Sequence, residues 1–464
     1  MLNRKENSPH IALFPSAGMG HLTPFLRLAS MLLSHKDCHL TLITGHPTVS
    51  DTESSYISYF LSQNPEVNHI QLQIIPFHGS NPTTDDPFFL QFEATRRSAH
   101  LLHPLLSSTS PPLSALFSDF VVASTVSPIA ADLGIPNYIV ATTSAKFFCL
   151  MAYLPTLLSN VAELSRIPEV KIPGLTPLQI SSIPPPFKDP DHLFTAQLAT
   201  NALALSAAKG ILINTFDGFE SETLAAANDG RVLTHLPSFL PTGPLEPYEL
   251  NKEQMQHCLS WLDRKPAESV VYVSFGSRTA MSNDQIRELS KGLERSGYHF
   301  LWVLKTSKVD RDDKEELKDL LGYSFLERTE KSGMVVKGWV NQQEILDHPA
   351  IGGFINHCGW NSVMEAARRG IPMLAWPQHG DQMVNAEIVK DAGLGIWERK
   401  WGWGVEALLD GEEIAERIGE LMGNEKLKSN ARKVGEEARK ASGVDGSSEK
   451  VLMGVIEFLK QQKN

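Results

Sequence analysis

The chain has 464 residues, which is too long for one ordinary hydrophobic core, and its 42% hydrophobic content is enough to build two domains. Its net charge of −11 at pH 7 argues against a nucleic acid or an anionic membrane surface as a partner, since the sequence has no basic stripe or Lys/Arg cluster. The four cysteines, Cys38, Cys149, Cys258 and Cys358, form no CxxC pair and lack metal-ligand spacing. We therefore expect reduced thiols in a cytoplasmic protein without a bound metal.

The first ten residues, MLNRKENSPH, are polar and charged and lack the apolar core of a secretory signal. No uninterrupted apolar run reaches the length of a membrane span. These features predict a protein without integral membrane association, and we expect a monomer.

The first half of the chain reads as alternating strands and helices. A turn at residues 16–21 and a helix through Leu32 follow its first predicted strand. Segments 76–90 and 167–190 are rich in turn-forming and Pro residues, and they predict loops over a ligand-binding cleft. The predicted strands are residues 10–14, 39–44, 71–75, 115–118, 137–141 and 210–214.

The second half restarts after a linker at residues 241–250. Its predicted strands are residues 269–275, 334–337, 351–355 and 372–375, and helical spacing follows the later ones, as in a βαβ succession. The charge-dense stretch 305–332 predicts a solvated loop and an exposed helix. Apolar residues at helical spacing predict a last helix at residues 447–460.

Residues 339–382, WVNQQEILDHPAIGGFINHCGWNSVMEAARRGIPMLAWPQHGDQ, carry the most specific pattern of the chain. His357, Asn361 and Ser362 lie where a predicted strand hands over to a helix, and ligands of parallel sheets bind beyond the carboxyl ends of strands. Backbone N–H groups and the positive end of the helix dipole suit a diphosphate there. Asn361 and Ser362 can donate hydrogen bonds to phosphate oxygens, and His357 can donate another.

Other residues of the segment could bind the rest of a ligand that carries a base and sugar rings. Trp339 offers a face on which a base such as uracil can stack, and Gln342 can pair with the amide edge of such a base. Glu365 can accept two ribose hydroxyls, while Asp381 and Gln382 can bind sugar hydroxyls. Taken singly, each has a plainer reading, because tryptophans are usually core residues and Asn-Ser before a helix is usually an N-cap.

The pattern as a whole closely resembles the signature box of plant family-1 UDP-glycosyltransferases that act on small secondary metabolites. Asn341 stands where the family commonly has proline. The resemblance implies an α/β protein of the GT-B fold, with two facing Rossmann-like domains and a cleft between them. The acceptor domain would span residues 1–245, the UDP-sugar domain 246–446, and a C-terminal helix at 447–464 would cross back onto the first domain. The residues at the family's offsets are Trp339, Gln342, His357, Gly359, Trp360, Asn361, Ser362, Glu365, Asp381 and Gln382.

A glycine-rich turn, Gly18-Met19-Gly20, follows the first predicted strand. A nicotinamide or flavin oxidoreductase is the poorer explanation, because the third glycine of GxGxxG would fall at Thr23. His21, next in this turn, suits a general base for a phenol, and Asp119 at the end of a later strand can fix its tautomer and stabilise the imidazolium. The resemblance to the family's His–Asp dyad favours this role over plain helix capping. A noncatalytic nucleotide-sugar-binding protein would lack such a base.

Three further stretches resemble the plant flavonoid C-glucosyltransferases: residues 86–93, 274–282 and 376–382. That resemblance implies inverting transfer of glucose from UDP-glucose to an aromatic carbon of a phloretin-like or 2-hydroxyflavanone acceptor. An ordinary flavonoid O-glucosyltransferase is the alternative. By family position, Asp86, Phe88 and Arg278 would bind the acceptor, and Ser144 and Ser277 the donor. The resemblance implies UDP-glucose as co-substrate and no metal or other cofactor.

Overall fold

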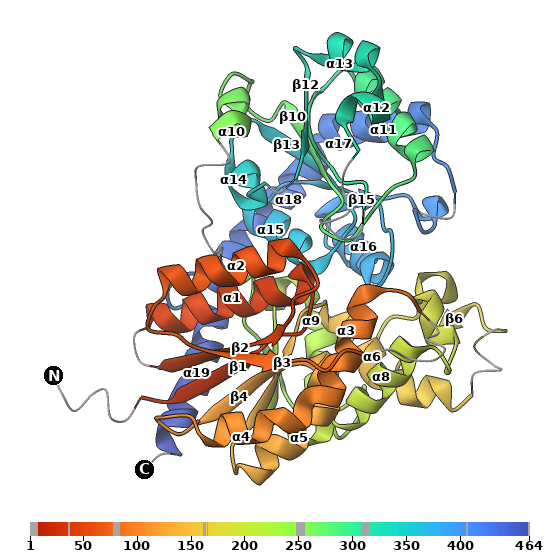
Figure 1. Ribbon diagram of the computed structural model, residues 1–464. Coiled ribbons are helices and arrows are strands. Elements are labelled where there is room, and N and C mark those ends of the chain that lie inside the picture. The colour runs from red at the N-terminus through yellow and green to blue at the C-terminus, as the bar shows by residue number, and fades with distance from the viewer. Residues whose placement is uncertain are drawn as a thin grey trace. The chain divides into compact units, whose positions relative to one another are not determined.

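The computed structural model describes residues 8–35, 38–77, 84–160, 164, 166–246, 256–307, 315–338, 340–404 and 407–462. The chain forms two compact units. Unit 1 comprises Met1–Tyr248 and Lys440–Asn464, and unit 2 comprises Glu249–Arg439 (Figure 1).

Unit 1 is built on a seven-stranded parallel sheet of order β3-β2-β1-β4-β5-β8-β9. Helices α1 and α2 lie on one side of this sheet, and α4 and α5 lie on the other (Figure 1). The strands are β1 (His10–Phe14), β2 (His39–His46), β3 (Asn68–Gln73), β4 (Ala115–Asp119), β5 (Asn137–Ala141), β8 (Gly210–Ile213) and β9 (Phe239–Pro241). The helices are α1 (Met19–Ser34), α2 (Asp51–Gln63), α3 (Pro87–Ser98), α4 (Leu102–Ser107), α5 (Ala123–Asp132), α6 (Ala145–Leu158), α8 (Leu193–Leu203), α9 (Asp217–Asn228) and α19 (Ser447–Gln461).

The central strands of unit 1 are buried along their whole length. All five residues of β1, β4 and β5 are buried, as expected for parallel strands covered by helices on both faces. The last helix, α19, packs on β9, and the Ser448 hydroxyl donates a hydrogen bond of 2.5 Å to the carbonyl of Gly243. The end of the chain is thereby fastened to the first sheet.

Unit 2 is built on a six-stranded parallel sheet of order β12-β11-β10-β13-β14-β15. Its strands are β10 (Val270–Ser274), β11 (His299–Leu304), β12 (Gly333–Lys337), β13 (Ile351–Asn356), β14 (Met373–Ala375) and β15 (Gly395–Trp397). Its helices are α10 (Gln256–Leu262), α11 (Asn283–Ser296), α12 (Leu317–Leu321), α13 (Tyr323–Thr329), α14 (Gln342–Asp347), α15 (Trp360–Arg369), α16 (Gln382–Asp391) and α17 (Gly411–Gly423), followed by α18 (Glu425–Ser442), which ends in unit 1.

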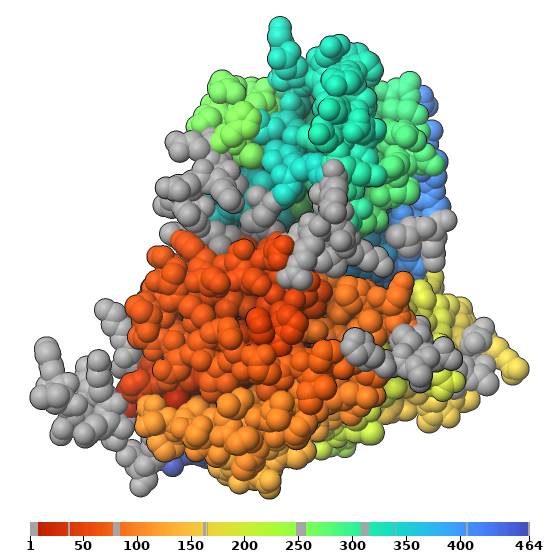
Figure 2. Space-filling view, in the orientation of Figure 1, coloured from red at the N-terminus to blue at the C-terminus, as the bar shows by residue number. Residues whose placement is uncertain are grey.

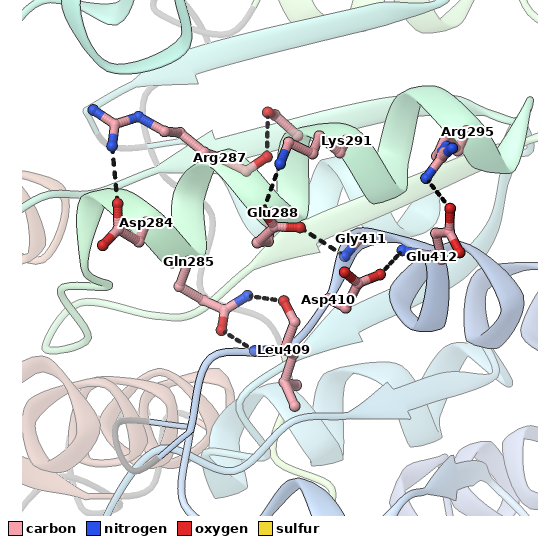
Figure 3. Close-up of polar contacts among 11 residues, drawn as sticks. Asp284, Gln285, Arg287, Glu288, Lys291, Arg295, Leu409, Asp410, Gly411 and Glu412 are labelled. Carbon is pink, nitrogen blue, oxygen red and sulfur yellow. Dashed lines mark hydrogen bonds and ion pairs between the residues drawn. The ribbon is translucent and has the colours of Figure 1, made fainter.

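Helices α11 and α17 of unit 2 pack unusually closely. A Cβ on Gly292 would lie 2.6 Å from Cγ2 of Ile414, so glycine is required at the crossing. The buried Gln285 side chain accepts from Leu409 N–H at 2.8 Å and donates to Leu409 C=O at 3.2 Å (Figure 3). This amide holds the loop that leads into α17, while ion pairs such as Arg287–Asp284 lie on the exposed side.

The sequence predicted the α/β class and most central strands, and the structure confirms this class with two Rossmann-like sheets. The prediction for β3 was shifted, because β3 is a half-buried edge strand that pairs Thr41 with Asn68, whereas the apolar residues Ile74 and Ile75 follow its end. Strands β9, β11 and β15 were not predicted. The short apolar run of β15 and the three-residue β9 are too brief to give a clear period.

Two segments predicted as loops contain regular structure, and the stretch predicted as a solvated loop with an exposed helix contains two short helices. Helix α3 begins at Pro87 inside the predicted loop 76–90, and a short antiparallel pair, β6 (Glu169–Val170) with β7 (Leu178–Gln179), lies in the predicted loop 167–190. Within 305–332, α12 and α13 lie at the surface of their unit (Figure 2), yet they bury Leu320 and Phe325.

We expect Gln285→Ala to destabilise unit 2 by about 2–4 kcal/mol, because it leaves the buried N–H and C=O of Leu409 without partners. Urea denaturation followed by tryptophan fluorescence measures this, since all eight tryptophans lie in unit 2. The matched control is Arg287→Ala on the same helix, which removes an exposed ion pair and should change the free energy of unfolding by less than about 0.5 kcal/mol. Equal unfolding midpoints for both variants would contradict the role given to Gln285.

Candidate active site

Two predicted catalytic residues meet where the chain order of the strands in the first sheet reverses, between β1 and β4. The strands after β1 continue to one side and those from β4 to the other, which makes the gap between their carboxyl ends the usual ligand position. His21 lies in the first turn of α1, directly after β1, and Asp119 is the last residue of β4. The structure brings them together, with Nδ1 of His21 2.8 Å from Oδ2 of Asp119.

The Asp119 carboxylate is 1% exposed and fully hydrogen-bonded. It accepts from the Ser16 hydroxyl at 2.9 Å and from the Val121 N–H at 3.1 Å. Burial acts to raise the pKa of Asp119, but the charge and hydrogen bond of His21, with the other two donors, lower that pKa below its usual value. Asp119 therefore stays ionised near neutrality and orients the imidazole.

The His21 ring is oriented by its Nδ1 atom, which also lies 3.2 Å from the Thr142 hydroxyl. The side chain keeps 23% exposure. With Nδ1–H directed to Asp119, the neutral imidazole carries its lone pair on Nε2, as a general base requires. Ser16 and Thr142 were not predicted, because nothing in their local sequence distinguishes them from ordinary turn residues.

The turn before His21 is held by a buried carboxylate that the sequence analysis missed. Gly18, at φ 102°, caps α1 and donates its N–H to Glu53, which also accepts from the N–H groups of Val49 and Ser50 at 3.0 Å. Burial raises the pKa of Glu53, although these donors partly oppose the shift. The Ser50-x-x-Glu53 spacing identifies a capping box, but its contact with Gly18 spans 35 positions and has no local signal.

Aromatic rings gather beside His21. Phe92 of α3 meets the His21 ring edge-to-face at 5.4 Å, and the Phe88 ring would lie 3.2 Å from a Cβ on Gly18. Phe89 stacks on Phe194 of α8 at 4.2 Å. Asp86 accepts the Phe88 N–H at 2.9 Å and so caps α3. The predicted acceptor residues Asp86 and Phe88 thus lie at the start of the helix whose next turn contacts His21.

Ser144, predicted to contact the donor, is fully buried in unit 1. Its hydroxyl accepts the Phe147 N–H at 3.2 Å and caps α6. The neighbouring N–H groups of Ala145 and Lys146 donate to the buried Glu220 at 3.0 Å. In this structure Ser144 therefore serves the start of α6.

The second sheet repeats the arrangement of the first. The chain order reverses between β10 and β13, and residues 275–278 and 357–359 follow these two strands. Asn356 ties the two strand ends together, since its amide donates to Ser274 C=O at 2.9 Å and its amide oxygen accepts from Cys358 N–H at 2.7 Å. Cys358 adopts φ 62°, and Gly359 then begins α15 without a side-chain cap, which suits a helix start that binds phosphate.

His357 is held between two glycines. A Cβ on Gly276 would lie 2.6 Å from Cε1 and Nε2 of the ring, and a Cβ on Gly359 would lie 2.5 Å from Nε2. The buried Nδ1 atom has no hydrogen-bond partner within the described ranges, so packing alone orients the ring. Burial, followed by the charge of His379, lowers the pKa of His357 to about 3. The imidazole is therefore neutral, and any hydrogen bond that it donates at neutral pH comes from the uncharged form.

Three predicted donor residues form one hydrogen-bonded group. The Gln342 amide donates to Ser362 Oγ at 2.9 Å and to Glu365 Oε2 at 2.7 Å, while its oxygen accepts from Tyr272 at 3.3 Å. Glu365 is 8% exposed. The residues assigned by resemblance to uracil, phosphate and ribose are thus mutually oriented. Tyr272, at mid-strand, was not predicted.

Asp381 and Gln382 begin α16. Gln382 Oε1 accepts the N–H groups of Gln378 at 2.8 Å and His379 at 3.0 Å, and Asp381 Oδ2 accepts from Asn385 at 2.8 Å. The Asn385 amide also donates to Cys358 C=O at 3.0 Å, which connects this loop to the His357 turn.

The remaining predicted residues are dispersed around these turns. Trp360, the first residue of α15, is 3% exposed and followed by Asn361, whereas Ser277 and Arg278 lie half-buried in the loop after β10. Trp339 lies outside the described residues. In the part of the chain that the structure describes, no group of three His, Cys, Asp or Glu side chains could hold a metal ion.

Because the resemblance assigns His357 to the diphosphate, we expect Gly276→Ala to weaken UDP binding by about tenfold. The added methyl must displace the imidazole, and one hydrogen bond is worth roughly 1 kcal/mol. Calorimetric titration with UDP measures the change. Gly322→Ala is the matched control, since Gly322 has φ 77° against 75° for Gly276 and nothing within 4 Å of its Cβ position. Parent-like UDP affinity in Gly276→Ala would disprove the assignment of a packed His357 ring to the diphosphate.

Comparison with known proteins identifies the family. The family described as UDP-glucoronosyl and UDP-glucosyl transferase matches residues 249–433. UDP-glycosyltransferase 708C1 of Fagopyrum esculentum is 50% identical over 460 residues, covering 98% of this chain and 96% of that protein. Isoflavone 7-O-glucosyltransferase 1 of Glycine max is 32% identical over 446 residues, covering 90% and 91%.

A solved structure agrees with these sequence relatives. The crystal structure of LpCGTa in complex with UDP superposes with a TM-score of 0.86 at 46% identity, covering 97% of this chain and 99% of that chain. No helix among the described residues is long and apolar enough to cross a membrane. The chain belongs to the plant family-1 UDP-glycosyltransferases, and it is a UDP-sugar-dependent glycosyltransferase of the GT-B fold.

Proposed function

We propose that this enzyme transfers glucose from UDP-glucose to an aromatic carbon of a phloroglucinol-type flavonoid, with inversion at the anomeric carbon and with His21 as the general base. The observation that carries the proposal is the 2.8 Å contact of His21 Nδ1 with the buried Asp119 carboxylate, which leaves Nε2 to accept a proton. The 46% identity to LpCGTa supports the C-glucosyltransferase subgroup.

The reaction begins with proton removal from an acceptor hydroxyl. His21 Nε2 takes the phenolic proton, and Asp119 stabilises the imidazolium that forms. The phenolate shares its charge between the oxygen and the ortho carbons of the ring. An ortho carbon attacks the anomeric carbon from the side opposite UDP, which leaves with the bonding electrons and gives a β-linked product. The ring carbon then loses its proton and the ring regains aromaticity.

Carbon and oxygen of the same phenolate compete for the sugar, so the position of the acceptor decides the product. Phe88 and Phe92 bring aromatic surface close to His21, which suits a flat phenolic ring. We assign Asp86 and Arg278 to the flanking hydroxyls of the acceptor. Asp86 caps α3 through Phe88 N–H, so its carboxylate is held at the start of the helix that also carries Phe92.

On the donor side, we assign the diphosphate to the start of α15, with His357, Asn361 and Ser362 as side-chain donors. Glu365 would accept from the ribose, Trp339 and Gln342 would bind uracil, and Asp381 and Gln382 would bind the sugar. Ser277 would contact the donor from the loop after β10. Helix-end N–H groups and these donors stabilise the leaving diphosphate without a metal ion in this proposal.

Flavonoid O-glucosyl transfer is the second candidate, and the 32% identical isoflavone 7-O-glucosyltransferase supports it. Both reactions use the same base and donor. A noncatalytic nucleotide-sugar-binding protein would have no need of a buried carboxylate behind His21, so the His21–Asp119 pair argues against it.

His21→Ala should lower turnover by roughly a hundredfold to ten-thousandfold, the usual contribution of a general base, and should leave UDP affinity unchanged. Asp119→Asn should also turn over slowly, since an amide cannot stabilise the imidazolium. Steady-state kinetics together with UDP calorimetry separates the two effects. Near-normal turnover in His21→Ala would remove His21 from the mechanism.

Product analysis tests the choice of carbon. Incubation with UDP-glucose and phloretin should yield a glucoside that survives hot acid, because a carbon–carbon bond is not hydrolysed. A phenol with one isolated hydroxyl has no similarly activated ortho carbon and serves as the control, with slow O-transfer or none expected. If phloretin gives only acid-labile glucosides, the enzyme is an O-glucosyltransferase.

A further inference from the structure

Residues 376–382, which we call the donor loop, follow β14 and carry Asp381 and Gln382. A second segment, residues 399–404, follows β15 and is called here the support segment. It includes the 3-10 turn Arg399–Trp401. The mechanism above gives the support segment no role, yet two of its residues contact the donor loop.

Trp401 is the first contact. It is 1% exposed, and its ring lies 5.0 Å from that of Trp376, which is fully buried. The Trp401 indole N–H donates to Glu413 of α17 at 2.7 Å, so the ring is fixed from behind by a helix of the same unit. Trp376, the first residue of the donor loop, therefore packs on an aromatic ring that is hydrogen-bonded to α17.

Gly404 is the second contact. Its N–H donates to Pro377 C=O at 2.9 Å. A Cβ on this residue would come within 2.6 Å of three side-chain atoms of Gln378. Gln378 is 2% exposed and its amide donates to Trp376 C=O at 3.0 Å, so the side chain has little room to move aside.

Gln378 in turn connects to the residue assigned to the sugar. Its backbone N–H donates to Gln382 Oε1 at 2.8 Å, and the next N–H, of His379, donates to the same oxygen at 3.0 Å. These two donors fix the Gln382 amide oxygen, while the amide nitrogen lies 3.3 Å from Nδ1 of His379 and has a second N–H for a sugar hydroxyl. A displacement that shifts the backbone at Gln378 would therefore change the direction in which Gln382 points.

We propose that the support segment positions the donor loop for recognition of the glucosyl group, with Gly404 and Trp401 as positioning residues that act through Gln378 and Gln382. The proposal rests on the assignment of Gln382 to the sugar. Uracil, ribose and phosphate are assigned to other elements, α14 and α15, so the support segment should affect UDP-glucose and spare UDP.

The test is calorimetric titration of the full-length chain with UDP and with UDP-glucose, which requires no acceptor and is independent of the choice between C- and O-transfer. Gly404→Ala should weaken UDP-glucose binding by about tenfold, the loss of about one hydrogen bond, and change UDP binding by less than about twofold. Trp401→Phe keeps a ring but loses the bond to Glu413, and should give a smaller shift of the same kind. It also provides the test should Gly404→Ala fail to fold.

The matched control is Gly419→Ala in α17, where nothing lies within 4 Å of the Cβ position, and both affinities should stay at the parent value. The double variant Gly404→Ala/Gln378→Ala removes the three atoms that the new methyl would meet while keeping the Gln378 backbone N–H. It should bind UDP-glucose more tightly than Gly404→Ala alone.

Equal weakening of UDP and UDP-glucose in Gly404→Ala would overturn the proposal, as would unchanged UDP-glucose affinity or a double variant no better than the single one. If Gln382→Ala also leaves UDP-glucose affinity unchanged, the assignment of Gln382 to the sugar fails. If the Gly404 and Trp401 variants bind UDP-glucose like the parent while Gln382→Ala binds it more weakly, only the positioning role is disproved.

Discussion

The hydrogen bond between His21 and Asp119 depends on one constraint, that two parallel strands end side by side. Phe14 of β1 pairs in register with Ser118 of β4, so the turn after β1 and the last residue of β4 share one edge of the sheet. Gly18 lets the chain turn into α1 at φ 102°, and Glu53 anchors its N–H. The His21 ring is therefore placed by backbone pairing, and its hydrogen bonds to Asp119 and Thr142 set its direction.

The same constraint organises unit 2. Ser274 of β10 pairs with Asn356 of β13, and the Asn356 amide joins the two turns that follow. Gly276 and Gly359 leave space for the His357 ring. Within the described ranges, no hydrogen bond to Nδ1 orients this ring. In each unit a histidine thus follows a strand at the point where the strand order reverses. In unit 1 an ionised carboxylate, Asp119, lies behind His21, and in unit 2 the His357 imidazole is neutral and held by packing.

The sequence predicted strands that have a clear apolar pattern and site residues that stand at the family's characteristic positions. Apolar runs identified β1 and β5 at their observed bounds, and the 339–382 box selected Gln342, whose amide proves to donate hydrogen bonds to the similarly selected Ser362 and Glu365. Contacts between distant positions could not be predicted. Glu53 reaches Gly18 across 35 positions, and Gly404 meets Gln378 only because β14 and β15 are neighbours in the sheet. Such partners have ordinary local sequences.

The proposed mechanism requires that Asp119 hold His21 with its lone pair on Nε2. Long-range nitrogen–proton NMR on the histidine-labelled protein reads this tautomer directly, and the His21 signals are those absent from His21→Ala. At mildly alkaline pH we expect a protonated Nδ1 and an unprotonated Nε2 in the unmodified enzyme, and loss of that preference in Asp119→Asn. A His21 ring protonated on Nε2 in the unmodified enzyme would contradict it.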